Sequence, residues 1–525
     1  MKNALLSVND KTGIAEFAAE LVDLNFKIWA SGRTAKNISD AGIEVEDISG
    51  LVGGGAILGH KVVTLSREIH AGLLADENDD DELKELGIPR IDLVAVDMYP
   101  LEDEIVRAGS DEKSVIEQTD MGGPGILRSA AKGRRIVLSR PEQREEVIKW
   151  LQADMPEAED FKRKLAADAE ATVASYVLQS AKYISRGDYS GTVTKKLADS
   201  AYGENRWQQE SALYVGPSND ALSLAYFEQI AGASLSYNNY CDVDRLLQTT
   251  THIAAGFDAN FNVVPKIAVG GKHGNTCGVS VGETAEAAVK KMLEGDLRAI
   301  FGGSIFVNFD IDEKIAERLI HHESESRRLL DLIVAPNVTT EAIEILARKK
   351  GKCRLLVNPA LNSLDKNCLD TAERSRYVRG GMLVQQNYDN ILDLSQLEQQ
   401  PDELISHDIV LGWAIGSTSN SNTITIVKDG QLLGNGVGQQ DRVGAAELAI
   451  KRAKDSGHDI KNALAYSDSF FPFADGPMVL VDAGISTIFA TSGSLGDKKV
   501  KEAITNAGAR IYWLPDSEIR GFYAH

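Results

Sequence analysis

Short apolar runs alternate with amphipathic segments along residues 1 to about 150, and this alternation limits the possible folds more than any other feature. Residues 4–8, 27–30, 91–96 and 135–138 have the apolar character of buried strands. After the first run, Ile14, Phe17, Ala18 and Leu21 recur at the spacing of one helix face. A repeated strand–loop–helix order predicts an α/β fold with a parallel sheet and with ligands at the carboxyl ends of its strands.

The loops after these strands carry small polar side chains, a lysine and glycines. Because the carboxyl ends of parallel strands meet at one edge, we expect these residues to converge on one rim of the sheet. Helix N-termini at such a rim favour an anionic group such as phosphate. The residues concerned are Ser7, Lys11, Ser31, Thr34, Gly122 and Gly123.

A second α/β pattern covers residues 265–513 and occurs twice. The first copy has a strand–turn–strand at 265–282, helices at 283–294, 312–322 and 340–350, and strands at 299–307, 331–334 and 353–357. The second copy opens with a hairpin whose Asp429-Gly430 pair is a strong tight-turn signal. Helices at 443–455, 476–483 and 497–507 and strands at 463–467, 486–490 and 510–513 follow. This duplication predicts two domains packed together with a ligand cleft between them.

Length, charge and cysteine usage exclude several classes of protein. A chain of 525 residues is too long for one core, and its formal net charge of −21 repels the phosphate backbone of nucleic acids. The four cysteines are scattered, which is typical of reduced thiols and argues against a structural zinc. No apolar run approaches the length of a membrane span, and the N-terminus lacks a signal-peptide pattern. We therefore expect a cytoplasmic protein that binds neither nucleic acid nor membranes.

Residues 268–280 form a glycine-rich stretch between two predicted strands, with Lys272 and His273 side by side in the turn. Glycines there let a backbone approach a ligand closely. A histidine transfers protons near neutral pH, and a lysine stabilises developing negative charge. The dipeptide taken alone favours the alternative of a solvated Lys–His pair in a glycine-rich loop, and only the rest of the chain reverses that preference.

Short motifs spread along the whole chain resemble one family in their order. They are Ser7-Val-Asn-Asp-Lys-Thr-Gly, Ile69-His-Ala-Gly, Met98-Tyr-Pro, Asp120-Met-Gly-Gly-Pro, Tyr202-Gly-Glu-Asn, Leu235-Ser-Tyr-Asn-Asn, Lys272-His-Gly-Asn, Phe301-Gly-Gly, Gly380-Gly-Met-Leu-Val-Gln, Gly438-Gln-Gln-Asp-Arg442, Ser467-Asp-Ser-Phe-Phe-Pro-Phe473 and Ser492-Gly-Ser. The chain resembles the bifunctional AICAR transformylase/IMP cyclohydrolase family, which carries out the last two steps of de novo purine synthesis.

The resemblance implies a three-domain architecture and a homodimer. Residues 1–190 would form a methylglyoxal-synthase-like cyclohydrolase domain, and residues 200–365 and 366–525 would form two cytidine-deaminase-like αβα domains of the transformylase. The substrates implied are AICAR, FAICAR and IMP, with 10-formyltetrahydrofolate as the folate co-substrate. A zinc mechanism is disfavoured because the chain has no H-x-E followed by P-C-x-x-C, and no metal is expected.

For formyl transfer, the resemblance implies that His273 is the base, that Lys272 assists charge and proton movement, and that Asn422 holds the substrate. A weakly nucleophilic amine needs such a base, and the tetrahedral oxyanion needs a positive partner. Arg442 and Arg520 are candidates for the ribotide phosphate or the folate glutamate. The other substrate-binding positions implied are Tyr202, Asn239, Gly302, Gly303 and Asp331, with Phe470, Phe473, Ser492 and Gly493 around the pterin. Core packing is an equal alternative for the two phenylalanines.

For ring closure, the resemblance implies Tyr99, Asp120 and Lys132 as catalytic residues. It also implies Gly32, Lys61 and Thr64 as substrate-binding residues, beside the rim residues named above. Two family positions differ here: Val63 stands where a catalytic lysine is usual, and Ala201 stands where an arginine usually binds phosphate. Arg33 or Arg67 could restore the first charge, and Arg206 could replace the second. The alternatives are therefore a transformylase with weakened or lost cyclohydrolase activity, or a non-catalytic paralogue that binds nucleotide or folate.

Overall fold

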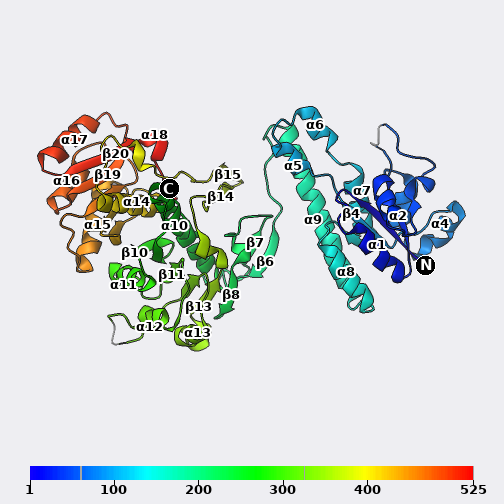
Figure 1. Ribbon diagram of the computed structural model, residues 1–525, viewed down its shortest axis with the longest axis horizontal. Coiled ribbons are helices and arrows are strands. Elements are labelled where there is room, and N and C mark those ends of the chain that lie inside the picture. Colours follow the sequence, from blue (N-terminus) through cyan, green and yellow to red (C-terminus); the bar gives the residue numbers. More distant parts are fainter. Residues whose placement is uncertain (59–61, 324–325, 524–525) are drawn as a thin grey trace. The chain divides into compact units, whose positions relative to one another are not determined.

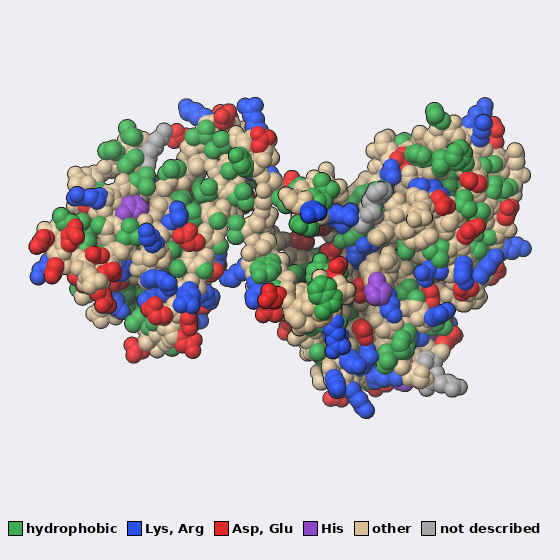
Figure 2. Space-filling view, turned by 180° about the vertical axis from the view of Figure 1, so that it is seen from behind, with side chains coloured by type: hydrophobic (Ala, Val, Ile, Leu, Met, Phe, Trp, Pro, Cys, Tyr) green, Lys and Arg blue, Asp and Glu red, His purple; other side chains and the backbone are tan. Residues whose placement is uncertain are grey.

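The structure is a computed structural model that describes residues 1–58, 62–323 and 326–523, and it divides the chain into two units (Figure 1). The first unit spans Met1–Thr194 and the second spans Lys195–His525. Within the described residues, no helix is both long enough and apolar enough to cross a membrane. Figure 2 shows basic and acidic side chains interspersed over the visible face of each unit.

The first unit contains the predicted parallel sheet. Its five strands lie in the order β3-β2-β1-β4-β5, and every pair is parallel. The central strand β1 separates β2 on one side from β4 on the other, so the order of connection reverses at β1. Such a reversal opens a crevice at the carboxyl ends of the strands, where ligands bind in open α/β sheets. The strands are β1 (Lys2–Val8), β2 (Phe26–Ala30), β3 (Glu46–Asp47), β4 (Leu93–Asp97) and β5 (Ile136–Leu138).

Helices pack on this sheet through the apolar faces that the sequence predicts. Ile14, Phe17, Ala18 and Leu21 of α1 are all buried. The longest helix described in this unit, α9, packs against α7. The helices of this unit are α1 (Ile14–Asp23), α2 (Gly32–Asp40), α3 (Arg67–Leu74), α4 (Asp80–Leu86), α5 (Leu101–Val106), α6 (Glu112–Glu117), α7 (Gly122–Lys132), α8 (Gln143–Gln152) and α9 (Ala158–Ile184).

The second unit is organised around one mixed sheet of eleven strands. Their order is β20-β19-β18-β16-β17-β10-β9-β11-β12-β13-β8. The strands are β8 (Glu228–Ala231), β9 (Lys266–Lys272), β10 (Asn275–Gly282), β11 (Ser304–Val307), β12 (Leu332–Ala335), β13 (Arg354–Val357), β16 (Ile424–Lys428), β17 (Gln431–Gly436), β18 (Leu464–Ser467), β19 (Thr487–Ser492) and β20 (Arg510–Pro515).

The predicted repeat is present, and both copies contribute to this one sheet. Each copy begins with an antiparallel hairpin. The third strand of the copy pairs antiparallel with the first strand of the hairpin, and the fourth and fifth strands continue from the third strand in parallel. The two hairpins meet where β10 pairs with β17, with Ser280 opposite Gln431. The two copies thus share a continuous sheet instead of facing each other across a cleft. The division at residue 365 into two cytidine-deaminase-like domains stays a prediction.

Two largely buried helices pack against each other in the middle of this unit, and the sequence patterns did not predict them. α10 (Tyr237–Phe261) packs on α14 (Glu403–Ser417), and both have long buried stretches. A helix buried on all sides has no polar stripe, so its sequence lacks the amphipathic signal. The other helices are α11 (Ala285–Gly295), α12 (Glu313–His321), α13 (Thr340–Leu346), α15 (Arg442–Asp455), α16 (Asp475–Asp482), α17 (Asp497–Asn506) and α18 (Asp516–Ile519).

Two short hairpins complete the second unit. β6 (Lys195–Asp199) pairs with β7 (Ala212–Val215), and β14 (Glu373–Val378) pairs with β15 (Gly381–Gln386). The β14–β15 hairpin is exposed along almost its entire length. An isolated hairpin of two strands is at best marginally stable in water, so contacts beyond its own two strands must support it.

Candidate functional site

One edge of the eleven-stranded sheet gathers strand ends from both copies of the repeat. The end of β9 pairs with the start of β10, and the start of β16 pairs with the ends of β17 and β18. At the joint, Asn435 Nδ2 on β17 donates to Thr276 Oγ1 on β10 at 3.1 Å. The turn that carries Lys272 and His273 and the segment that leads into β16 therefore lie on the same edge, called here the shared edge.

A half-buried carboxylate on α10 holds the Lys272–His273 turn in place. His273 adopts a left-handed backbone conformation with φ 55°, and Gly274 follows with φ 69°. Asp242 on α10 accepts the Gly274 N–H at 2.8 Å and, through its other oxygen, the Ser304 hydroxyl at 2.8 Å. Lys272 Nζ donates to the Phe301 carbonyl at 3.0 Å. The turn thus presents the lysine and histidine from a rigid support.

Asp242 is a functional residue that the sequence analysis missed. Burial raises the pKa of its carboxyl, while the bonds from Ser304 and Gly274 act in the opposite direction. It lies in the first turns of α10, a helix that the sequence analysis did not recognise. An acidic residue on an unrecognised helix gives no motif signal, so only the three-dimensional structure could place it beneath the turn.

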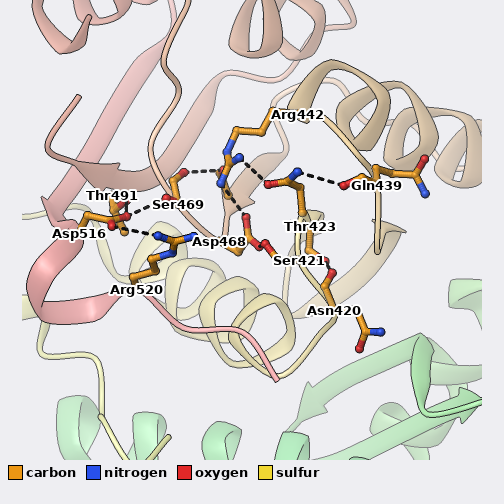
Figure 3. A network of polar contacts seen from close by, with 12 residues as sticks. Asn420, Ser421, Thr423, Gln439, Arg442, Asp468, Ser469, Thr491, Asp516 and Arg520 are labelled. Carbon is orange, nitrogen blue, oxygen red and sulfur yellow. Dashed lines mark hydrogen bonds and ion pairs between the residues drawn. The ribbon is translucent and has the colours of Figure 1, made fainter. Parts of the chain in front are cut away.

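A second polar cluster lies where β16 begins. Arg442 Nη1 donates to Asn422 Oδ1 at 2.6 Å, and its Nη2 forms an ion pair with Asp468 at 3.2 Å. Asn422 Nδ2 in turn donates to the Gln439 carbonyl at 3.0 Å, and the Ser421 hydroxyl donates to Asp468 at 2.6 Å. Figure 3 shows Arg442 reaching from the start of α15 toward Asp468 and Ser421. Arg442 therefore orients Asn422 directly.

Burial dominates the electrostatics of this cluster. It raises the pKa of Asp468 even though the Arg442 guanidinium lowers it, because the carboxyl is completely inaccessible to solvent. Arg442 Nε is buried without a partner among the described residues. A buried donor without a partner is costly, and it marks a place where a ligand acceptor would be stabilising.

Arg520 belongs to a neighbouring cluster on the same side of the sheet (Figure 3). Its guanidinium lies 3.7 Å from Asp516, which also accepts hydrogen bonds from Ser469 at 2.8 Å and from Thr491. Since Ser469 directly follows Asp468, the Arg442 and Arg520 clusters are adjacent along the chain. Two arginines near each other can hold anionic groups that a protein of net charge −21 would otherwise repel.

The structure brings several other predicted residues to the shared edge. Gly302 and Gly303 directly precede β11, whose first residue pairs with Gly271, and Asp331 directly precedes β12. Asp331 forms an ion pair with Arg348 at 2.6 Å. Ser492 ends β19, and Gly493 N–H donates to Asp497 at 2.7 Å. These positions line both flanks of the turn.

The remaining predicted residues have structural roles or open surroundings. Asn239 caps α10 by accepting the Ser236 N–H at 3.0 Å, and the Tyr202 carbonyl accepts the Tyr237 N–H at 3.0 Å. Phe473 is 71% exposed and Phe470 is half-buried, whereas Phe471 between them is the one buried in the core. The packing alternative therefore holds for Phe471 and not for Phe473, whose ring is free to meet a ligand.

In the first unit, the rim residues meet at the carboxyl ends of β1 and β2. The hydroxyls of Ser7 and Ser31 lie 2.8 Å apart, and Thr34 Oγ1 accepts the Val8 N–H at 3.3 Å. Gly32 begins α2 with φ 35°. Burial and then the nearby Arg33 lower the pKa of Lys11, so a second cation stands beside this lysine. The rim is therefore cationic and rich in hydroxyl donors.

A loop at the N-terminus of α7 forms the other side of this unit's site. Asp120 accepts the Gly123 N–H at 2.9 Å, and its own N–H donates to the Tyr176 hydroxyl at 2.7 Å. Burial raises the pKa of Asp120, and backbone N–H groups of Gly123, Tyr99 and Gly122 oppose that shift. Tyr99 and Asp120 are thus neighbours, and Thr64 lies against Gly122, where an added Cβ would be 2.5 Å from its hydroxyl.

Three predicted positions of this unit lie away from the loop at the N-terminus of α7, and a fourth lies outside the described residues. Lys132 is the last residue of α7, ten residues from Gly122, which is about 15 Å along a helix axis. Val63 packs against the hydrophobic core. The Arg67 side chain is largely exposed and pairs with Glu68 at 3.4 Å. Lys61 lies outside the described residues.

Among the residues described, Glu294, His322 and Glu323 bring three potential metal ligands within 4.8 Å of one another. His322 Nε2 lies 3.0 Å from Glu294, and Lys290 lies 3.8 Å from the same carboxylate. Glu294 therefore already has two side-chain partners in this cluster. The absence of a metal cofactor stays a prediction.

The fold and its two candidate sites define the chain as an α/β protein with a cluster of polar residues at strand ends in each unit. An MGS-like domain matches residues 13–125, and the family described as AICARFT/IMPCHase bienzyme matches residues 130–452. The chain belongs to the AICARFT/IMPCHase bienzyme family.

Curated relatives match it over nearly their whole length. The bifunctional purine biosynthesis protein PurH of Oceanobacillus iheyensis is 34% identical, and the PurH proteins of Bacillus cereus strain B4264 and Bacillus anthracis are 35% identical. Each alignment covers 97% of this chain and 98% of the relative. A chain in the crystal structure of ForH is 33% identical over 36% of this chain and 100% of its own, with a TM-score of 0.33.

Proposed function

We propose that this chain is a bifunctional enzyme of purine biosynthesis. Residues 195–525 transfer a formyl group from 10-formyltetrahydrofolate to AICAR, and residues 1–194 close the product FAICAR to IMP. The observation that carries the proposal is the shared edge, where the Lys272–His273 turn and the Asn422–Arg442–Asp468 cluster come together in a member of this family.

Formyl transfer begins when the 5-amino nitrogen of AICAR attacks the formyl carbon of the folate. His273 takes the proton that the amine loses, and Lys272 stabilises the tetrahedral oxyanion. The intermediate collapses by breaking the bond to N10, which leaves with a proton as tetrahydrofolate. Asn422, oriented by Arg442, holds the carboxamide side of the ribotide.

Charged and aromatic groups around the shared edge bind the two substrates. Arg442 and Arg520 bind the ribotide phosphate or the folate glutamate, because guanidinium groups donate strong hydrogen bonds to such anions. The exposed ring of Phe473 offers a flat apolar face to the pterin, and Gly493 allows close approach. The other residues proposed for substrate binding are Tyr202, Asn239, Gly302, Gly303, Asp331, Phe470 and Ser492.

Ring closure occurs at the rim of the first unit. The carboxamide nitrogen of FAICAR attacks the formyl carbonyl carbon within the same molecule, and water leaves to give IMP. Asp120, with its raised pKa, and Tyr99 exchange the protons, while the N-terminus of α7 stabilises negative charge. Ser7, Lys11, Ser31 and Thr34 bind the phosphate, and Arg33 keeps the rim cationic.

A homodimer is proposed from the resemblance and from the β14–β15 hairpin. Tyr377 is 82% exposed and Leu383 is 61% exposed on this hairpin, which leaves an apolar surface without cover. A second copy of the chain is the proposed cover. Light scattering of the wild type and of a Leu383→Glu variant tests this assignment; a wild-type monomer at micromolar concentration contradicts it.

The bifunctional assignment is tested with purified protein, AICAR and 10-formyltetrahydrofolate. Tetrahydrofolate, FAICAR and IMP are followed separately over time, and FAICAR alone is supplied in a second assay. Production of IMP in both assays supports the full proposal. FAICAR as the end product identifies a transformylase alone, and substrate binding without turnover identifies a non-catalytic paralogue.

A further inference from the structure

The aromatic ring of Tyr523 lies between two guanidinium groups. Arg245 Cζ and Arg374 Cζ are each 3.7 Å from the centre of this ring. Two guanidinium groups cannot occupy the same ring face at that distance, so each covers one face. Cation–π attraction to both faces offsets the repulsion between the two positive charges.

Polar bonds fix the same tyrosine in three directions. Its hydroxyl donates to Asp244 on α10 at 2.6 Å, and its N–H donates to the Ser419 carbonyl at 2.9 Å. Its carbonyl accepts from Arg374 Nη1 on β14 at 2.6 Å. Burial and the Asp244 carboxylate raise the pKa of Tyr523, so the hydroxyl remains a donor at neutral pH. Tyr523 thus joins α10, β14 and the segment after α14.

Arg245, the inner partner of this ring, contacts both parts of the shared edge. Its Nη2 donates to Asn420 Oδ1 at 2.9 Å and to the Thr418 carbonyl at 3.2 Å. Its aliphatic stem packs against Gly274, where an added Cβ would be 3.1 Å from Cγ of the arginine. One side chain therefore spans from the residue after His273 to the residue two positions before Asn422.

We propose that Tyr523 is a positioning residue for formyl transfer: it holds Arg245 in place and thereby sets the His273 turn relative to Asn422. This inference rests on the proposed function of the shared edge. Without the ring, Arg245 loses the cation–π contact and is repelled by the positive charge of Arg374. Its guanidinium group can then move away from Asn420. A displacement of about 1 Å between reacting groups typically costs about 100-fold in rate.

The test uses full-length Tyr523→Ala, with Tyr226→Ala as a matched control at an exposed tyrosine of the same unit. We expect kcat for formyl transfer to fall about 10- to 100-fold in Tyr523→Ala, with a smaller change in KM for AICAR. Tyr523→Phe keeps both ring contacts and loses one hydrogen bond, so its loss is expected to be only about threefold. Ring closure of supplied FAICAR serves as an internal control, because its residues lie in the other unit.

Hydrogen exchange supplies a readout independent of turnover. Faster exchange in residues 272–276 and 418–422 of Tyr523→Ala, with an unchanged melting temperature, supports the positioning role. Unchanged kcat and exchange overturn it, as does an equal loss of both activities. If Tyr523→Ala does not fold, the Arg374→Gln variant takes its place in every measurement. Arg374→Gln removes the guanidinium group from one face of the Tyr523 ring. A wild type that folds but lacks formyl transfer refutes the proposed function, and exchange alone then decides whether Tyr523 holds the edge.

Discussion

His273 stands at the tip of its turn because the residues around it, and not its own preference, fix the backbone. Left-handed φ is uncommon for residues other than glycine, and here the hydrogen bond from the Gly274 N–H to the half-buried Asp242 maintains it. The backbone that carries the His273 side chain is therefore fixed before a substrate binds, and the side chain itself is exposed. The geometry suits a general base.

Replacing His273 by alanine is expected to reduce formyl transfer about 10²- to 10⁴-fold while AICAR still binds. The reason is that the base acts in the transition state and contributes little to ground-state binding. Steady-state kinetics and calorimetric titration with AICAR measure the two effects. His321→Ala, at an exposed histidine of α12, is the matched control. Unchanged turnover in His273→Ala would remove this residue from the mechanism.

Among single residues, the sequence singled out those that stand in short motifs. It did not single out the residues that hold those motifs in place. Lys272, His273 and Asn422 stand in segments with distinctive neighbours. Asp242 and Arg245 are brought to the edge by α10, and no local pattern marks them. Lys132 also belongs to a short motif, and the structure places it at the last residue of α7, so its catalytic role stays a prediction.

At the scale of elements, β17 and α15 approach so closely that only glycine fits between them. An added Cβ on Gly436 would lie 2.1 Å from the Ala445 carbonyl, and one on Gly434 would lie 2.2 Å from the Ala449 carbonyl. Both carbonyls belong to the helix backbone, which cannot move without disturbing its own hydrogen bonds. This contact sets the distance between the helix and the sheet.

Gly436→Ala is therefore expected to destabilise the second unit by about 1–3 kcal/mol, as overpacking of a dense interior does. Urea unfolding followed by tryptophan fluorescence measures the change. Gly381→Ala is the matched control, because an added Cβ there has open space and the backbone is not left-handed. Equal midpoints for the two variants would show that the helix shifts at no cost.

The turn between β16 and β17 depends on Asp408 of α14, whose carboxylate accepts the N–H groups of Asp429 at 3.0 Å and Gly430 at 2.8 Å. Burial raises the pKa of this carboxyl to about 6, despite those two bonds. The folded pKa lies above the ordinary value of 3.8, so protonation favours folding. The associated stability is present below about pH 4 and is lost as the pH rises through about 6.

Asp408→Asn is expected to remove this dependence. The stability of the variant relative to wild type should rise by about 3 kcal/mol between pH 4 and pH 7, since one pKa unit corresponds to about 1.4 kcal/mol. Urea unfolding at both pH values gives the difference. Asp455→Asn, at an exposed carboxylate, should show no such change. A constant difference for Asp408→Asn would mean that the carboxyl titrates normally.

The sequence predicted the regular elements of the two repeats but missed the helices α10 and α14 and the exposed β14–β15 hairpin. The helices and strands of both repeats match their predicted positions to within a few residues, and Asp429-Gly430 forms the expected turn. α10 and α14 were missed because each has a long stretch that is buried on every side, so no alternation of polar and apolar faces marks it in the sequence. Strand order was also beyond reach, because pairing across the β10–β17 joint depends on contacts distant in the sequence.

At the scale of the whole molecule, the proposed function assigns the two reactions to separate units, and the first unit departs further from the family pattern of residues. Val63 packs into the core where the family usually has a lysine, which removes one positive charge from the site. Loss of one oxyanion stabiliser typically costs about 10²- to 10³-fold in rate. Intramolecular attack, however, carries effective molarities of about 10⁵–10⁸ M, so ring closure can survive.

We therefore expect FAICAR to accumulate transiently before IMP appears, because ring closure is slower than formyl transfer. A time course from AICAR and 10-formyltetrahydrofolate measures both species, with Val63→Lys in parallel. The lysine variant should close the ring faster and shorten the lag in IMP. Absence of accumulation, together with no acceleration in Val63→Lys, would show that the missing lysine has no effect.

The joint between β10 and β17 also determines what happens if the chain is cut. Cleavage between residues 366 and 402 separates the repeats in sequence, but each fragment would then carry a raw strand edge with unpaired N–H and C=O groups. An exposed strand edge forms hydrogen bonds with strands of other molecules, so each fragment produced alone is expected to aggregate. Produced together, the fragments should find each other through that same edge, and a nicked protein should keep its activity as a non-covalent pair.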